Sequence, residues 1–175
     1  PYRRQRQMCI RDSHWEMLQW LCDNYGGEIQ LSLGMTTKTE EEKIIRLFED
    51  KKRNRDLTIY ACTSGYPVAF EDVCLLEITR LRECYEDIVK RIGFSGHHNG
   101  IAIDVAAYTL GAEVFERHFT LDRTWKGTDH AASLEPDGLR RLVRNLNATQ
   151  MSLTYKKDEI LPVEMVQRKK LKYRK

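Results

Sequence analysis

The pattern of hydrophobic and polar positions alternates along the chain between short apolar runs typical of strands and a spacing of three or four residues typical of helices. Short runs rich in β-branched and aromatic residues occur four times, at residues 27–34, 56–63, 91–96 and 112–120. Each run ends in small or polar residues, as buried parallel strands do. The segments between them repeat their apolar residues every three or four positions, which indicates helices. Strand and helix in regular alternation predict an α/β protein with a parallel sheet.

The helical segments carry start and stop signals. Thr37 and Glu40 form a capping box before an apolar stripe, and Gly111 supplies a C-cap. Ser13 is the expected N-cap of an amphipathic helix that precedes the first strand. Besides the helix that Thr37 caps, helices are therefore expected over residues 14–24, 73–81 and 101–110, and from Glu135-Pro136 through LRRLVRNL.

Two architectures fit this order: an open, doubly wound sheet or part of a (β/α)₈ barrel. Both place their chemistry at the carboxyl ends of the strands. Neither a GxGxxG motif nor a phosphate-binding loop follows the first strand, which counts against a dinucleotide-binding fold.

Composition excludes several classes of protein. With 175 residues, 41% of them hydrophobic and 31% charged, the chain has the composition of a globular domain and not of a fibrous or disordered protein. No window approaches the roughly 20 apolar residues of a membrane span, and the N-terminus lacks the apolar stretch of a secretory signal. We therefore expect a cytoplasmic protein without a membrane partner.

The formal net charge of +3 is unevenly distributed. Residues 1–13 hold four Arg and one Asp, and residues 156–175 hold eight basic and three acidic residues, which leaves a net charge of −5 for residues 14–155. Because the body is acidic and only the ends are basic, no nucleic-acid partner is expected. The basic tail is interpreted as a solvated terminus or as a helix that docks on a partner.

Two histidines are the strongest candidates for chemistry. His97 follows the third predicted strand and His118 ends the fourth. Consecutive parallel strands lie about 4.8 Å apart. Imidazoles on neighbouring strand ends can therefore bind one divalent cation and leave positions open to water or substrate oxygens. The alternative is that each is a hydrogen-bonded structural histidine.

Two further segments contain polar candidates. Thr63, Ser64 and Tyr66 follow the second strand and can donate hydrogen bonds at the same end of the sheet, although small polar residues there also suit a simple turn. The long polar loop after the fourth strand offers charged groups for substrate, or is an ordinary exposed loop; these groups are Asp122, Arg123, Lys126 and Asp129.

Four motifs in order resemble the sialic acid synthase family: LSLGMTT, ACTSGYPVAFEDV, IGFSGHHNGIAIDVAAYTLGA and ERHFTLDRTWKGTDHAASLEPDGL. The resemblance covers residues 27–148 and continues more weakly into ILPVEM. It implies a TIM barrel whose last four βα units are present here, and an enzyme that condenses phosphoenolpyruvate with N-acetylmannosamine or a related hexosamine and releases phosphate.

The resemblance also implies roles for individual residues. His97 and His118 match the family's metal ligands, for Mn²⁺ or Mg²⁺, and are the expected catalytic pair. Gly96 replaces a frequent Asp, a change not expected to disturb the metal. The residues that match substrate contacts are Ser32 and Ser95 near phosphoenolpyruvate, Ser64 where the family often has Asn, and Tyr66 and Asp129 at the sugar.

The same resemblance sets the expected organisation. Residues 1–13 are interpreted as a non-native leader, 14–150 as the C-terminal half of the barrel and 151–175 as the basic tail. The strands that would carry the phosphate-binding lysines are missing, so we expect a truncated fragment that is inactive by itself. The intact parent is expected to be a homodimer, since family members often carry a C-terminal domain that reaches into the partner's site.

Two other functions stay open. A metal-dependent sugar isomerase would use the same barrel and histidines without consuming phosphoenolpyruvate. A non-catalytic binding module would use them only structurally, and its metal affinity would not depend on them.

Overall fold

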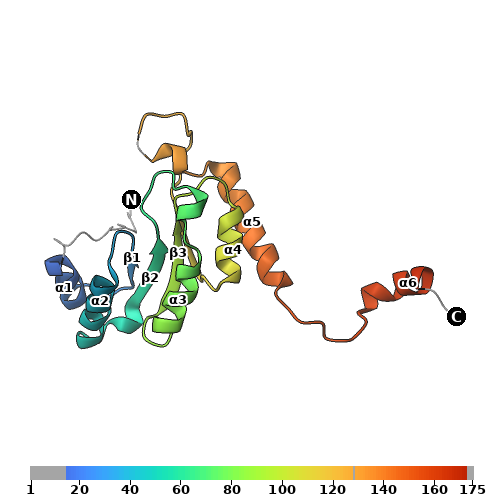
Figure 1. The fold of residues 1–175 in the computed structure, drawn as a ribbon, viewed down its shortest axis with the longest axis horizontal. Helices are drawn as coiled ribbons and strands as arrows, with labels where there is room; N and C mark the ends of the chain where they lie inside the picture. Colours follow the sequence, from blue (N-terminus) through green and yellow to red (C-terminus); the bar gives the residue numbers. More distant parts are fainter. Residues whose placement is uncertain (1–14, 128, 173–175) are drawn as a thin grey trace.

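The computed structural model describes residues 15–127 and 129–172. The expected leader over residues 1–13 and its Ser13 cap lie outside these described residues. Within them, the chain forms a sheet with helices packed along it, followed by an extended C-terminal segment (Figure 1).

The sheet has four parallel strands in the order β1-β2-β3-β4. Parallel pairing of neighbouring strands confirms the predicted sequence of βα units. The strand β3 has the predicted bounds, whereas β1 and β4 are shorter than predicted because each pairs on one side only. The bounds are β1 (Ile29–Ser32), β2 (Leu57–Cys62), β3 (Arg91–Gly96) and β4 (Val114–Arg117).

Beyond β4 the chain leaves the sheet and pairs with a later segment. The Leu134 amide donates to the His118 carbonyl oxygen at 2.8 Å, and the Thr120 amide donates to the Leu134 carbonyl oxygen at 3.0 Å. Phe119 and Leu134 form an isolated parallel bridge. The predicted strand over 112–120 therefore ends early, and its last residues close the base of the loop that follows.

The predicted helices are present with adjusted ends. The Thr37–Glu40 capping box is formed at α2, and Gly111 follows α4 with a φ of 100°. The helix predicted from Val73 begins three residues later, because Cys74 has a φ of 53°, which a helix does not allow. The bounds are α1 (Trp15–Asn24), α2 (Lys38–Asp50), α3 (Leu76–Tyr85) and α4 (Ala102–Thr109).

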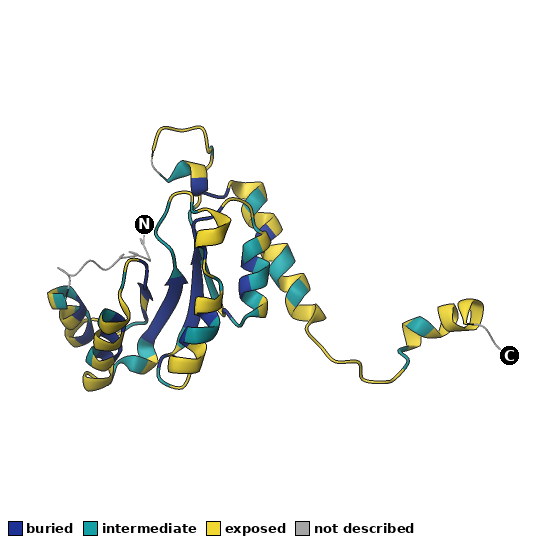
Figure 2. Ribbon diagram, in the orientation of Figure 1, coloured by how far each residue is buried: buried dark blue, intermediate teal, exposed yellow. Residues whose placement is uncertain are grey.

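The last two helices differ in how they contact the body. The helix α5 (Pro136–Ser152) has Pro at its first turn as predicted and packs beside α4. The helix α6 (Pro162–Leu171) has no buried residue and extends away from the sheet (Figures 1 and 2). No helix among the described residues has the length and apolarity needed to cross a membrane.

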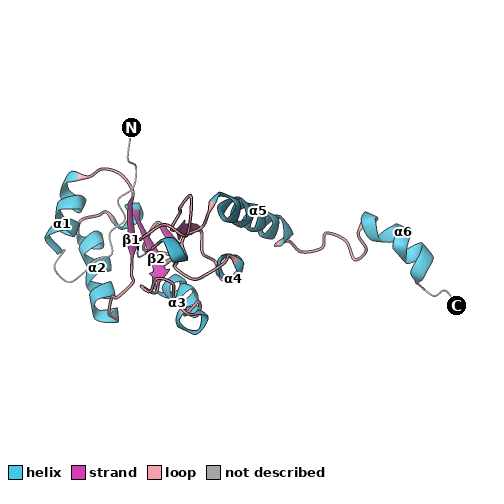
Figure 3. Cartoon of the chain, turned by 90° about the horizontal axis from the view of Figure 1, so that it is seen from above, coloured by secondary structure: helices cyan, strands magenta, loops and turns pink. Residues whose placement is uncertain are grey.

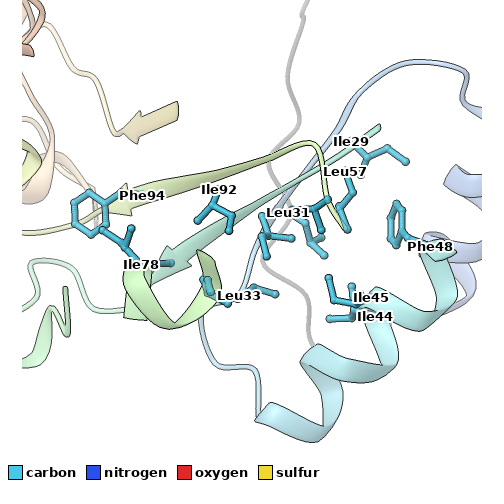
Figure 4. Close-up of a cluster of buried hydrophobic side chains, with 14 of the residues drawn as sticks. Ile29, Leu31, Leu33, Ile44, Ile45, Phe48, Leu57, Ile78, Ile92 and Phe94 are labelled. Carbon is cyan, nitrogen blue, oxygen red and sulfur yellow. The ribbon is translucent and has the colours of Figure 1, made fainter. Parts of the chain in front are cut away.

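The two faces of the sheet have opposite character. One face is apolar and is covered by helices, which wrap around the outside of the strands (Figure 3). There Leu31, Leu57 and Ile92 pack with Phe48 of α2 and Ile78 of α3 in the core (Figure 4). Because strand residues alternate between faces, the intervening side chains point to the other side. These are mainly polar and include Ser32, Tyr60, Cys62, Ser95 and Glu116.

Candidate metal centre

Three potential ligands meet at the carboxyl end of the sheet. His97 follows β3, Glu116 lies in β4, and His118 follows β4. One ligand atom from each residue lies within 4.8 Å of the other two. The ring centroids of the two histidines are 5.1 Å apart. The two residues singled out by sequence are therefore brought together, as one divalent cation requires.

Strand alternation explains this arrangement. Glu116 and His118 are two residues apart, so they project from the same face of the strand. Ser95 of β3 pairs in register with Glu116 of β4. Two residues after each of them, His97 and His118 lie side by side. Glu116 was not among the metal ligands expected from the sequence. Its position two residues before His118 in a predicted strand could have indicated it, because this spacing places both side chains on the same face.

His97 has one ring nitrogen engaged and one unengaged. Its Nδ1 lies 3.0 Å from the Thr63 carbonyl oxygen, and a carbonyl only accepts, so Nδ1 carries the proton. Its Nε2 is buried and has no hydrogen-bond partner within the described part of the chain. A buried nitrogen lone pair without a donor is the arrangement that a metal ion would complete.

The two histidines have pKa values shifted in opposite directions. Burial works to lower the pKa of His97, but the nearby Cys62 thiol, 3.9 Å from Nδ1, and the Thr63 carbonyl outweigh it, so the pKa is raised. Burial and the charge on His97 lower the pKa of His118. His118 is therefore the more readily neutral of the pair, and only neutral imidazole binds a metal.

The three serines expected at the substrate site lie at or just after the carboxyl ends of their strands. Ser95 and Ser32 are each 2% exposed, at the ends of β3 and β1. The hydroxyls of Ser95 and Ser64 are buried without hydrogen-bond partners among the described residues. Ser64 lies directly over Gly34, where a Cβ atom would come within 2.4 Å of its hydroxyl oxygen. Buried hydroxyls left in this state suit a polar ligand.

Tyr66 and Asp129 complete the group. The Tyr66 ring centroid lies 4.4 Å from that of His97 and 5.5 Å from that of His118. The Asp129 carboxylate lies 3.8 Å from His118 Nδ1. A pocket of about 290 Å³ opens beside them; its lining is His118, Phe119, Gly127, Asp129, His130 and Ser133.

Two other charged residues of the loop have partners away from the pocket. Asp122 accepts hydrogen bonds from the backbone and hydroxyl of Thr124. Arg123 donates to the Asn99 side chain and to the Ala131 carbonyl. Neither Asp122, Arg123 nor Lys126 lines the pocket, so among these four candidates only Asp129 is at the site.

Comparison with known proteins identifies the family. A model described as the NeuB family matches residues 11–158 of this chain. The chain belongs to the NeuB family. The predicted resemblance to sialic acid synthases is therefore confirmed.

Two curated NeuB relatives give the scale of similarity. The human N-acetylneuraminate-9-phosphate synthase is 42% identical over 146 residues, which are 83% of this chain and 40% of that protein. The N,N'-diacetyllegionaminic acid synthase of Campylobacter jejuni is 37% identical over 127 residues, or 72% of this chain and 37% of its own length. The chain thus spans about 40% of the length of these relatives.

A solved structure confirms the fold class. The N-acetylneuraminic acid synthetase of Leptospira borgpetersenii, crystallised with citrate, superposes with a TM-score of 0.74 at 31% identity, covering 91% of this chain and 55% of that one. The four parallel strands are therefore one half of a TIM barrel, and their polar face is the face that lines a barrel's interior.

Proposed function

We propose that this half-barrel carries the metal-binding part of a synthase that joins phosphoenolpyruvate to N-acetylmannosamine or a related hexosamine and releases phosphate. The observation that carries the proposal is the convergence of His97, Glu116 and His118 at the carboxyl end of the sheet. NeuB relatives named as synthases of several nonulosonic acids support the same reaction class.

The donor set favours a transition-metal ion. Two imidazoles and one carboxylate would hold Mn²⁺ more readily than Mg²⁺, which prefers oxygen ligands and water. A bound ion of this kind supplies Lewis-acid polarisation of a carbonyl oxygen. The unpartnered His97 Nε2 supports this assignment because His97 also offers a ring nitrogen within 4.8 Å of ligand atoms of Glu116 and His118.

The other residues around the centre would bind and orient the substrates. The buried hydroxyls of Ser64 and Ser95 are placed to donate hydrogen bonds to anionic oxygens such as those of phosphoenolpyruvate. Asp129, at the pocket beside His118, is placed to accept hydrogen bonds from sugar hydroxyls. Tyr66, which packs against both histidines and is 39% exposed, is placed to contact the sugar at the open side of the site.

Ser32 has a supporting position in this scheme. It is buried at the end of β1, and its hydroxyl accepts a long hydrogen bond of 3.5 Å from the Gly34 amide. The hydroxyl also hydrogen-bonds the Cys62 thiol, a weak acceptor that a substrate oxygen would replace. We place it with Ser64 and Ser95 on the phosphoenolpyruvate side of the site.

Turnover should require more than the four described strands. A closed barrel has eight strands, and the described sheet ends in two edge strands, β1 and β4. We therefore expect the 175-residue chain to bind metal but not to convert phosphoenolpyruvate and N-acetylmannosamine in the presence of Mn²⁺. Robust product formation by this chain would contradict that expectation.

Metal titration tests the proposal directly. The Mn²⁺ dissociation constant of the chain is measured from the electron paramagnetic resonance signal of unbound Mn²⁺. His97→Ala and His118→Ala should each weaken binding by at least roughly 100-fold, since each removes a ligand. Arg80→Lys, which alters an ion pair with Glu41 between α2 and α3, is the control. Unchanged affinity in the His97 and His118 variants would favour a non-catalytic module.

The choice between synthase and isomerase needs a second measurement. Phosphoenolpyruvate should change the water relaxation rate of the Mn²⁺-loaded chain, because its oxygens would approach the metal and displace water. Ser95→Ala should reduce that response. A chain that binds Mn²⁺ and converts the hexosamine in the absence of phosphoenolpyruvate would point to sugar isomerisation.

A further inference from the structure

A second cluster of buried polar side chains lies behind the metal centre, on the helix-facing side of the sheet. It consists of His98, Asp104 in the first turn of α4 and Arg117 of β4, whose side chains are at most 3% exposed. One Asp104 carboxylate oxygen pairs with Arg117 Nη1 and lies 3.2 Å from His98 Nε2. None of the three belongs to the ligand set or to the expected substrate contacts.

Arg117 connects the two strands that carry the ligands. In the chain it lies between Glu116 and His118, and its side chain points to the opposite face. Its Nη2 donates to the His98 carbonyl oxygen at 2.8 Å, and its Nη1 donates to the Gly100 carbonyl oxygen at 3.0 Å. One guanidinium thus holds the segment that leaves β3 immediately after His97.

The cluster packs against Gly96, where the lack of a side chain leaves space for its atoms. A Cβ atom at this position would lie 3.0 Å from His98 Cε1 and 3.1 Å from Arg117 Cδ, and 2.9 Å from Cε1 of Phe94. The Phe94 ring also stacks on the His98 imidazole, with centroids 5.9 Å apart. The cluster is therefore packed closely against the strand that positions His97, so a displacement of one is transmitted to the other.

We propose that Asp104 and Arg117 are positioning residues, whose buried ion pair holds the segment after β3 against β4 so that the three metal-binding side chains converge. The inference rests on the metal site proposed above. A guanidinium that is paired with a carboxylate and also donates to two carbonyls is fixed in direction, which a lysine ammonium cannot reproduce. Groups that hydrogen-bond directly to metal ligands typically change metal affinity 10- to 100-fold when replaced, and we expect an effect of this order from Arg117, which acts through the residue next to His97.

The test compares two Arg→Lys substitutions in the 175-residue chain. Arg117→Lys should weaken Mn²⁺ binding roughly 10- to 100-fold and alter the visible absorption spectrum of the Co²⁺-loaded chain, which reports ligand geometry. Arg80→Lys is the matched control, because Arg80 also pairs with a buried carboxylate, that of Glu41, but between α2 and α3. It should leave the Mn²⁺ affinity within about twofold and the Co²⁺ spectrum unchanged.

Gly96→Ala supplies a second perturbation that keeps every polar group. In this chain Phe94, His98 and Arg117 pack against a glycine and not against the Asp frequent in the family, so the added methyl should push against them and weaken Mn²⁺ binding about threefold to tenfold. This variant decides the question if circular dichroism shows Arg117→Lys to be unfolded. Wild-type affinity and Co²⁺ spectrum in the folded variants, with binding lost in His97→Ala, would overturn the positioning role alone. Normal binding by His97→Ala would overturn the metal site and this inference with it.

Discussion

The two ends of the sheet both carry charged clusters, but only one of them leaves polar groups unengaged. At the amino end, the Glu28 carboxylate receives hydrogen bonds from Lys90 at 2.6 Å, Thr58 at 2.8 Å and Arg91 at 3.3 Å. At the carboxyl end, His97 Nε2 and the hydroxyls of Ser64 and Ser95 have no partner in the described part of the chain. The first arrangement stabilises the fold, whereas the second costs stability and suits binding.

A Glu→Gln substitution at each end of the sheet distinguishes a role in binding from a role in stability. Glu116→Gln removes a negative ligand from the carboxyl end, and we expect Mn²⁺ affinity to fall roughly 10- to 100-fold with little change in the free energy of unfolding. Titration followed by electron paramagnetic resonance measures the first quantity, and urea unfolding measures the second. A large loss of stability without a loss of affinity would make Glu116 a structural residue.

Metal binding should also depend steeply on pH. Because the pKa of His97 is raised, protons compete with the metal at a higher pH than for an ordinary histidine, and affinity should fall roughly tenfold per pH unit below that pKa. The metal-free fold has the opposite dependence: the His97 contribution to stability is full below the pKa of unfolded histidine and is lost as the pH rises through the raised value. Titrations and urea unfolding at several pH values measure both trends, and a pH-independent affinity would exclude His97 as a ligand.

Glu28→Gln is the counterpart at the amino end. It keeps the shape of the side chain but removes the charge that Lys90 and Arg91 bind, so the free energy of unfolding should fall by about 1 kcal/mol with Mn²⁺ affinity unchanged. The Lys90 hydrogen bond lowers the pKa of Glu28, so its contribution is present above the pKa of an unfolded carboxyl and is lost as the pH falls through the lowered value. The variant and wild type should thus converge in acid, and equal stability at neutral pH would contradict this assignment.

The smallest expected effect concerns Cys62. Replacing its thiol by the less acidic hydroxyl in Cys62→Ser removes the main group that raises the pKa of His97 against burial. The pH at which Mn²⁺ affinity falls should therefore shift downward, giving roughly threefold tighter binding at mildly acidic pH. An unchanged pH profile would mean that the Thr63 carbonyl and the Glu116 carboxylate, and not Cys62, raise the pKa of His97.

Features that depend on neighbouring residues could be predicted from the sequence, whereas features that depend on contacts between distant residues could not. The bounds of β3 and the capping box of α2 follow from neighbouring residues, so the sequence was sufficient for them. His97 and His118 could be paired because consecutive parallel strands have adjacent ends. In contrast, the ion pair between Asp104 and Arg117 depends on how α4 packs on β4, which no local pattern specifies.

The bridge between Phe119 and Leu134 separates the strand end that holds His118 from the loop that follows it. It closes the loop at its base, directly beside His118, through the amide of Leu134. Residues between these two points can be replaced, inserted or deleted while the strand end that holds His118 stays in place. A gene encoding this protein could therefore vary the loop by changes confined to it, without rebuilding the cluster of His97, Glu116 and His118 each time.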